Sequence, residues 1–379
     1  MIVAENKSGF PENRIIQMAR RENNKKRSFL IVNPSQAKHI PAKPSETMAL
    51  FKRLSDELKK YISADENVLF IGFAETATAI GAGVASFFKN SDYMHTTRES
   101  IENAEMIVEF KELHSHAVQQ TLQSSEWNRI INGKKHIIFM EDEISTGTTI
   151  MNFVNALCEN KKVPEDVEFS VCSVINGMSR ERTAELAEKG VVFRYIMKIS
   201  MDGHKDMQID TPPVMLDLNK NSDRISKHIS INGMVNARTG IKTESYIKAV
   251  NSLAEKIISS AEISDNMKIA VIGTEEFMYP AIYTAYQIEK KFKSVSVVTH
   301  STTRSPVEPH NEKNYPLKSR AVLESFYEKN RVTYLYNTYY DYDLVILVTD
   351  SGREDAETED IFMSSFMNCR NFITVRWVK

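Results

Sequence analysis

Short apolar segments alternate with helix-forming segments along most of the chain, and this alternation limits the fold more than any other feature of the sequence. In the first half, the apolar segments predict strands at 68–71, 92–95, 136–140, 167–175 and 191–199. The segments between them predict helices at 76–88, 147–159 and 180–189, with a polar stretch before residue 136. Strands that alternate with helices in this way are typical of an α/β fold with a parallel sheet.

The alternation stops between residues 202 and 242 and then begins again. That stretch contains Pro212 and Pro213 among many polar residues, so we place a domain junction there. After it, strands are expected at 268–272, 294–299, 332–336, 343–349 and 372–377, and helices at 244–263, 277–291 and 355–367. At 379 residues the chain is long enough for two domains. The predicted organisation is a segment at 1–44 packing on the first domain, a first domain at 45–201, a junction at 202–242 and a second domain at 243–379.

The two halves also resemble each other in sequence. Val68–Glu75 parallels Ile269–Glu276, and each is followed by a helix, a strand and a Thr-Thr-Arg. Ile137–Asp142 is echoed by Val345–Asp350, an apolar strand that ends in an acid. The sequence therefore predicts two related Rossmann-like α/β units, with chance similarity as the alternative.

Residues 136–149 give the clearest indication of a ligand site. An apolar strand ends in Glu141 and Asp142, and a hydroxyl-rich loop with a glycine then opens a helix. Ligands of parallel sheets bind at this carboxyl edge, and the amides of such a loop form a cradle for an anion. The loop residues expected to hold a phosphate are Ser145, Thr146, Gly147, Thr148 and Thr149. The two acids suit sugar hydroxyls or a Mg²⁺ ion, so the pattern favours a phosphorylated sugar.

This stretch resembles the signature of the type I phosphoribosyltransferases. The resemblance implies that Glu141 and Asp142 hold the ribose hydroxyls of phosphoribosyl pyrophosphate and that the loop holds its 5′-phosphate. Glu143 departs from the family, which usually has an apolar residue there.

In that family the loop after the first strand binds pyrophosphate. The matching residues are Gly72, Ala74, Glu75 and Thr76, with Thr97 and Arg98 after the next strand. Glu75 suits phosphate only through Mg²⁺. An ordinary strand-to-helix turn and a solvated arginine are the alternative interpretations.

The family's mobile catalytic hood would lie before the signature, where the sequence places Glu112, His114 and His116. A zinc site would need a third ligand with clear spacing, which the sequence lacks. We expect one of the histidines to orient or protonate the leaving group, with loop histidines of no special role as the alternative.

Four stretches together resemble a narrower group, the phosphoribosyltransferases encoded in bacterial tellurium-resistance gene clusters, whose C-terminal domain is named for a Thr-Arg-Ser-Pro motif. They are Lys26–Phe29 with Lys38–Pro41, Glu112–Ala117, Glu141–Thr149 and Thr303–Pro306. The resemblance implies a cytoplasmic protein in a stress-linked module that makes a nucleoside-like product.

The second unit has a candidate ligand edge of its own. Its residues are Glu276, Thr303, Arg304, Ser305, Asp350 and Ser351. Arg304 is expected to anchor an anion. Because Asp350 stands alone before a shortened loop, we expect this edge to accept a second reactant rather than phosphoribosyl pyrophosphate. A structural lobe without activity is the alternative.

The predicted function is Mg²⁺-dependent transfer of a 5-phosphoribosyl group to a small base-like nitrogen nucleophile. A non-catalytic sensor of phosphoribosyl pyrophosphate or of a nucleotide, built on the same fold, is the alternative. A formal net charge of -2 gives no general attraction to nucleic acid, and the basic residues near the N-terminus are expected to be solvated.

The sequence also bears on the cellular location of the protein and on its partners. Three scattered cysteines indicate a reducing, cytoplasmic setting. Val68–Phe88 is apolar over about the 20 residues of a membrane span, but Glu75 and three glycines favour a buried strand, loop and helix, so no membrane association is expected. A homodimer and contacts with neighbouring biosynthetic enzymes stay open.

Overall fold

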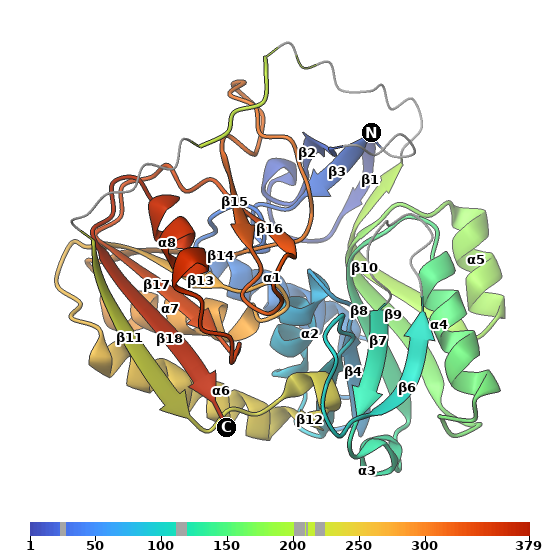
Figure 1. Cartoon of the computed structure of the whole chain (residues 1–379). Helices are drawn as coiled ribbons and strands as arrows, with labels where there is room; N and C mark the ends of the chain where they lie inside the picture. Colours follow the sequence, from blue (N-terminus) through green and yellow to red (C-terminus); the bar gives the residue numbers. More distant parts are fainter. Residues whose placement is uncertain (23–27, 111–119, 201–208, 210, 217–223) are drawn as a thin grey trace. The chain divides into compact units, whose positions relative to one another are not determined.

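The computed structural model describes residues 1–22, 28–110, 120–200, 209, 211–216 and 224–379 (Figure 1). The chain divides into two compact units. The first contains Met1–Phe10, Ala49–His204 and Val235–Lys248, and the second contains Pro11–Met48, Lys205–Met234 and Ala249–Lys379. Helices α1 (Pro44–Leu58) and α6 (Thr243–Ser260) have residues in both units.

A seven-stranded sheet organises the first unit, in the order β1-β10-β9-β8-β4-β5-β12. The five inner strands are parallel, whereas the two edge strands are antiparallel to their neighbours. The strands are β1 (Ile2–Asn6), β4 (Val68–Gly72), β5 (Ser91–His95), β8 (His136–Ile144), β9 (Glu168–Asn176), β10 (Val191–Ser200) and β12 (Ile241–Lys242). Every residue of β4 is buried, as its unbroken apolar sequence requires of an inner parallel strand.

Helices connect the parallel strands of this sheet. They are α2 (Ala77–Ala85) after β4, α4 (Thr148–Glu159) after β8 and α5 (Arg180–Glu188) after β9. Between β5 and β8 the chain forms an antiparallel pair, β6 (Glu105–Phe110) and β7 (Gln120–Ser124), followed by α3 (Trp127–Ile131). Apolar side chains of the sheet and of α4, among them Ile71, Phe139 and Phe153, form the core.

The second unit contains a five-stranded sheet in which all strands are parallel, in the order β11-β18-β17-β13-β14. The strands are β11 (Ile225–Asn232), β13 (Lys268–Gly273), β14 (Ser296–Ser301), β17 (Leu344–Thr349) and β18 (Asn371–Val378). Helix α7 (Tyr279–Lys291) connects β13 to β14, and α8 (Ala356–Ser364) connects β17 to β18. The predicted fold class, α/β with a mainly parallel sheet in each of two units, is confirmed.

Two antiparallel pairs complete the second unit. They are β2 (Gln17–Arg20) with β3 (Phe29–Val32) and β15 (Arg320–Glu324) with β16 (Val332–Tyr336). The remaining short helices are η1 (Glu12–Arg14) in this unit and η2 (Ala237–Thr239) in the first unit.

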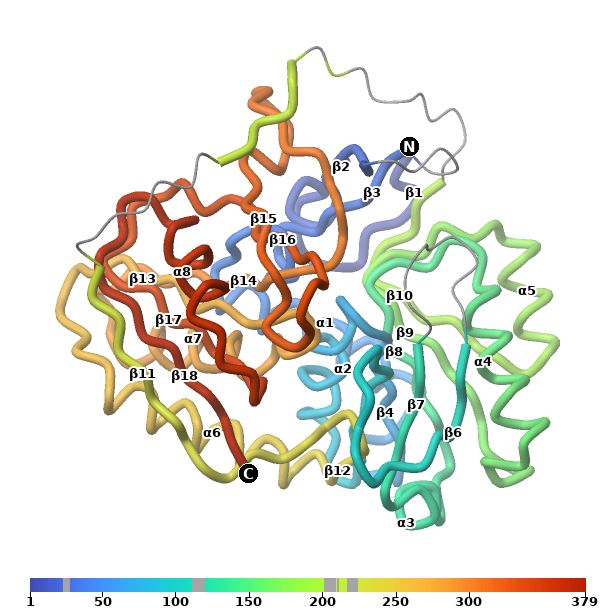
Figure 2. Tube along the Cα trace, in the orientation of Figure 1, coloured from blue at the N-terminus to red at the C-terminus, as the bar shows by residue number. Residues whose placement is uncertain are grey.

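The structure differs from the sequence-based expectation at two places. Residues 202–242 were expected to be a junction, yet they include β11, which lies beside β18 although the two strands are far apart in the sequence (Figure 2). Residues 1–44 were expected to pack on the first domain, whereas Pro11–Met48 group with the second unit. Main-chain hydrogen bonds of 2.9 Å in both directions between Ala42 and Thr299 hold this segment to β14.

Within the described residues, no helix has the length and apolar character needed to cross a membrane. The apolar stretch 68–88 forms the buried strand β4 and the nine-residue helix α2.

Candidate active site

The candidate site of the first unit lies where β5, β4 and β8 end. These three strands are neighbours in the sheet and parallel, so the segments that follow them meet at one edge. In the register of β4 and β8, Gly72 lies opposite Met140, and the amide of Phe73 donates to the carbonyl oxygen of Met140 at 3.1 Å. The acids after Met140 therefore extend beyond the end of β4.

Glu141, Asp142 and Glu143 form the end of β8 and are half-buried. The sequence placed them after a strand that ends at 140, but pairing with β9 continues through Ile144. The amide of Asp142 donates to Glu141 Oε2 at 3.1 Å, and the amide of Glu143 donates to Asp142 Oδ1 at 2.8 Å. A regular strand thus carries adjacent carboxylates to the sheet edge.

The hydroxyl-rich loop continues directly into α4. Ser145 and Thr146 are exposed, whereas Gly147 is buried and precedes the first helical residue, Thr148. The amide of Thr148 donates to Thr146 Oγ1 at 3.3 Å, and Arg182 Nε donates to the carbonyl oxygen of Thr146 at 3.1 Å. The loop is held in shape while Ser145 and Thr146 are exposed at a helix N-terminus, an arrangement suited to an anion.

Gly147 is required by this loop for two reasons. Its φ of 70° lies in the left-handed region, and a Cβ atom would come within 2.7 Å of Leu186 Cδ1. We expect Gly147→Ala to lower the free energy of unfolding by about 2–5 kcal/mol, through the left-handed conformation and the overpacking together. Urea denaturation measures the change.

Gly190 provides the matched control, because its φ is 83° but a Cβ atom would meet nothing within 4 Å. Gly190→Ala should cost about 1–2 kcal/mol, the conformational part alone. Equal losses in the two variants would contradict a packing role for Gly147.

The loop between β4 and α2 is pinned by side chains from two other segments. The amide of Ala74 donates to Thr96 Oγ1 at 2.8 Å, and Gln120 Nε2 donates to the carbonyl oxygen of Ala74 at 2.7 Å. Thr96 Oγ1 in turn donates to Gln120 Oε1 at 2.7 Å. The sequence analysis missed Thr96 and Gln120, because only the tertiary fold brings β7 to this loop.

The remaining residues expected to bind pyrophosphate lie around this pinned loop. A Cβ atom on Gly72 would come within 2.7 Å of the carbonyl oxygen of Ala77, so the tight turn into α2 needs glycine. Glu75 and Thr76 are half-buried between β4 and α2, and the peptide bond from Ala74 to Glu75 is cis. Thr97 is buried, with main-chain hydrogen bonds to Thr121, and the half-buried Arg98 follows it.

The three hood residues, Glu112, His114 and His116, lie outside the described residues. They fall in the interval between β6 and β7. In the described part of the chain, no group of three or more His, Cys, Asp or Glu side chains is arranged to hold a metal ion.

In the second unit, the structure places Arg304 between two buried acids. Its Nη2 lies 2.7 Å from Glu276 Oε1 and its Nε lies 3.3 Å from Glu275 Oε2. Arg331 Nη1 also lies 3.3 Å from Glu275 Oε2, and the buried Lys38 Nζ donates to the carbonyl oxygen of Glu275 at 2.8 Å. The expected anion anchor is therefore part of an ion-pair network with Glu275, Glu276 and Arg331. The sequence analysis missed Arg331 and the buried Lys38 beside Glu275.

The other candidates of the second unit lie at the same sheet edge. The main chain of Thr303 pairs with Tyr334, and its hydroxyl oxygen accepts from the amide of Ser305 at 3.1 Å. After β17, Asp350 Oδ1 accepts from the hydroxyl of Tyr327 at 2.6 Å, and Ser351 Oγ donates to the carbonyl oxygen of Phe326.

Two family models match successive parts of the chain. Residues 15–200 match a family model described as phosphoribosyl transferase, and residues 235–365 match one described as the TRSP domain C-terminal to that transferase. A search of the curated proteins returned no match.

Solved structures similar to this chain include adenine and orotate phosphoribosyltransferases. The adenine enzyme of Trypanosoma brucei is 10% identical, with 53% of this chain and 82% of that chain covered and a TM-score of 0.36. The adenine enzyme of Thermoanaerobacter pseudethanolicus is 12% identical, with 49% and 96% covered and a TM-score of 0.35. The orotate enzyme of Aeropyrum pernix is 13% identical, with 50% and 89% covered and a TM-score of 0.29.

The chain thus carries a phosphoribosyltransferase domain followed by a TRSP domain. The predicted enzyme class, phosphoribosyltransferase, is confirmed.

Proposed function

We propose that the first unit transfers the 5-phosphoribosyl group of phosphoribosyl pyrophosphate to a nitrogen nucleophile and releases pyrophosphate. One observation supports this most strongly. Strand β8 carries Glu141 and Asp142 directly to an exposed hydroxyl-rich loop that opens α4, inside the residues that match the phosphoribosyl transferase family.

In this proposal the side chains act mainly by positioning. Glu141 and Asp142 accept hydrogen bonds from the ribose hydroxyls, and residues 145–149 bind the 5′-phosphate. The bond from the anomeric carbon to nitrogen forms while the bond to the pyrophosphate oxygen breaks, through a transition state with positive charge on the sugar ring. Holding both ends of the donor fixes this geometry and excludes water.

The pyrophosphate would lie at the pinned loop, against Gly72, Ala74, Glu75 and Thr76, with Thr97 and Arg98 on its other side. The main-chain amides there and the guanidinium of Arg98 suit the negative charge of the leaving group. Glu112, His114 and His116 would orient or protonate it from the hood.

The donor set at this edge fits Mg²⁺ as cofactor. Mg²⁺ is commonly bound by one or two carboxylates together with substrate phosphates, rather than by a complete protein cage. Glu141 and Asp142 would hold it, directly or through water and the ribose hydroxyls, and its charge would neutralise that of pyrophosphate.

The biological setting rests on the sequence resemblance alone. We propose a cytoplasmic enzyme of the tellurium-resistance group, acting on a base-like acceptor in a stress-linked pathway to a nucleoside-like product. A homodimer and complexes with neighbouring enzymes belong to this proposal, and co-purification from the native host tests them.

Calorimetric titration of the full chain with phosphoribosyl pyrophosphate, with and without Mg²⁺, tests the donor assignment. Mg²⁺-dependent binding is expected, followed by pyrophosphate release when purine, pyrimidine and simple amine acceptors are screened. Binding without release for any acceptor would favour the sensor function. No binding in the presence of Mg²⁺ would contradict both.

A further inference from the structure

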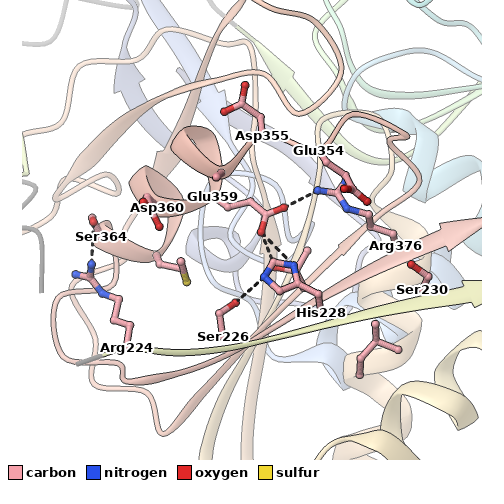
Figure 3. A pocket seen from close by; sticks show the side chains of 14 residues that line it. Arg224, Ser226, His228, Ser230, Glu354, Asp355, Glu359, Asp360, Ser364 and Arg376 are labelled. Atoms are coloured by element: carbon pink, nitrogen blue, oxygen red, sulfur yellow. Dashed lines mark hydrogen bonds and ion pairs between the residues drawn. The ribbon is translucent and has the colours of Figure 1, made fainter. Parts of the chain in front are cut away.

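A polar groove of about 730 Å³ lies on the second unit between β11, the neighbouring strand β18 and helix α8 (Figure 3). Alternate residues of β11 have side chains on the same face, so Ser226, His228 and Ser230 line the groove together, with Arg224 just before the strand. In the register with β18, His228 lies opposite Thr374 and Ser230 lies opposite Arg376.

Polar side chains in the wall of this groove are unusual for a helix packed on a sheet. Nearer the start of β18, Phe372 belongs to the apolar core, as expected for such a layer. Further along, Thr374, Arg376 and Glu359 are at most 7% exposed. Since burying polar groups has a cost unless they are paired, a buried polar set of this kind needs a reason.

The surroundings of His228 offer a reason for this buried polar set, because the ring lies between a hydroxyl and a carboxylate. Ser226 Oγ is 3.2 Å from His228 Nε2, and Glu359 Oε2 is 3.4 Å from His228 Nδ1. The contact with Glu359 is an ion pair when the ring is protonated, and a histidine whose Nε2 carries no proton can accept the hydroxyl proton of Ser226. Ser226 thus has the histidine that a serine nucleophile needs as its base, and a carboxylate lies close to the other ring nitrogen.

The carboxylate of Glu359 is held in place by Arg376. Arg376 Nη2 lies 2.5 Å from Glu359 Oε1, and Arg376 Nη1 donates to the carbonyl oxygens of Ser351 and Arg353 at 3.1 and 2.7 Å. Glu359 is thus oriented by a buried guanidinium, whereas Ser226 and His228 are exposed to the groove. A fixed acid near the histidine, a histidine within reach of a serine hydroxyl and an accessible groove are features expected of a site for nucleophilic catalysis.

We propose that this groove is a second catalytic site, which hydrolyses a carboxylic ester by way of an acyl-enzyme on Ser226. Ser226 Oγ attacks the ester carbonyl carbon, and its proton moves to His228 Nε2. The bond from the carbonyl carbon to the alcohol oxygen breaks, and the alcohol leaves with that proton. Water, deprotonated by His228, then releases the acid and restores the serine. Arg224 also lines the groove, where its Nη1 donates to Ser364 Oγ at 2.9 Å (Figure 3).

This activity is independent of phosphoribosyl transfer, so the two proposals fail separately. The full-chain protein is treated with a fluorophosphonate probe, which modifies activated serines, and the labelled peptide is identified by mass spectrometry. Hydrolysis of p-nitrophenyl acetate is measured in parallel. Labelling at Ser226 is expected, and Ser226→Ala or His228→Gln should lower hydrolysis by about 100-fold or more.

Ser259→Ala is the matched control, because Ser259 is an exposed serine of the same unit, on α6, whose hydroxyl donates to a main-chain carbonyl oxygen rather than to a histidine. It should keep labelling and hydrolysis within about twofold of wild type, since surface substitutions have small effects. A wild-type protein unlabelled at Ser226, or hydrolysis unchanged in Ser226→Ala, would overturn the proposal.

Glu359 is a positioning residue, and its test separates orientation from structure. Glu359→Gln keeps the side-chain shape and should lower kcat for the ester while leaving KM unchanged, because the histidine loses its orienting charge. A thermal melt confirms that the variant is folded. An unchanged kcat in the folded variant would mean that Glu359 only holds α8 to the sheet.

Discussion

Asp142→Asn is expected to lower the rate of phosphoribosyl transfer more than about tenfold, equivalent to at least about 1.4 kcal/mol of transition-state stabilisation. The amide keeps the size of the side chain but removes the charge that strengthens hydrogen bonds from the ribose hydroxyls. Since Asp142 is half-buried at the end of β8, the fold should be retained. Initial rates of pyrophosphate release and calorimetric titration with the donor measure the effect.

Asp166→Asn makes the same chemical change at an exposed position of the first unit. The Asp166 side chain is 74% exposed, and its Oδ2 atom lies 3.5 Å from Lys135 Nζ. This variant should bind and turn over the donor like the wild type. If Asp142→Asn, correctly folded, also kept full activity, the assignment of the donor site to the end of β8 would be wrong.

The largest loss of stability is expected for Asp92→Asn, because Asp92 is the buried acid of a charged cluster at β5. Its carboxylate lies 2.5 Å from Lys134 Nζ, 2.8 Å from Lys242 Nζ and 3.2 Å from Arg129 Nη1. The side chains of Asp92 and Lys134 are each 1% exposed. Neutralising Asp92 leaves a buried cation without its partner, which typically costs about 3–5 kcal/mol. Urea denaturation at neutral pH measures the loss.

The same cluster predicts a pH dependence. Burial by itself raises the pKa of Asp92, but hydrogen bonds from Lys134 and Lys242 outweigh it, so the pKa is lowered. A carboxyl group whose pKa is lower in the folded protein stabilises it above the unfolded pKa of about 3.9, and this contribution is lost as the pH falls through the folded pKa. The stability difference between wild type and Asp92→Asn should therefore shrink in acid.

Asp166→Asn again serves as the control, since an exposed ion pair contributes only about 0–1 kcal/mol. A loss below about 1 kcal/mol in Asp92→Asn, similar to that of the control, would show that the cluster does not stabilise the first unit.

The sequence by itself determined the α/β class, the parallel sheets and the stretch that carries the candidate donor site. These properties are local, because an unbroken apolar run such as 136–140 predicts an inner strand and a hydroxyl-rich loop with glycine predicts a helix N-terminus. The order of strand, acids and loop in residues 136–149 is likewise written in consecutive residues.

Only the tertiary structure decided which distant segments meet. Strand β11 has a polar sequence, and its pairing with β18 makes it a strand. Gln120 fixes the loop at Ala74. Ser226 and His228 lie on the edge strand β11, whereas Glu359 lies on α8, which comes much later in the sequence. Such contacts depend on hydrogen bonds and ion pairs between residues far apart in the chain, which no local pattern of side chains specifies.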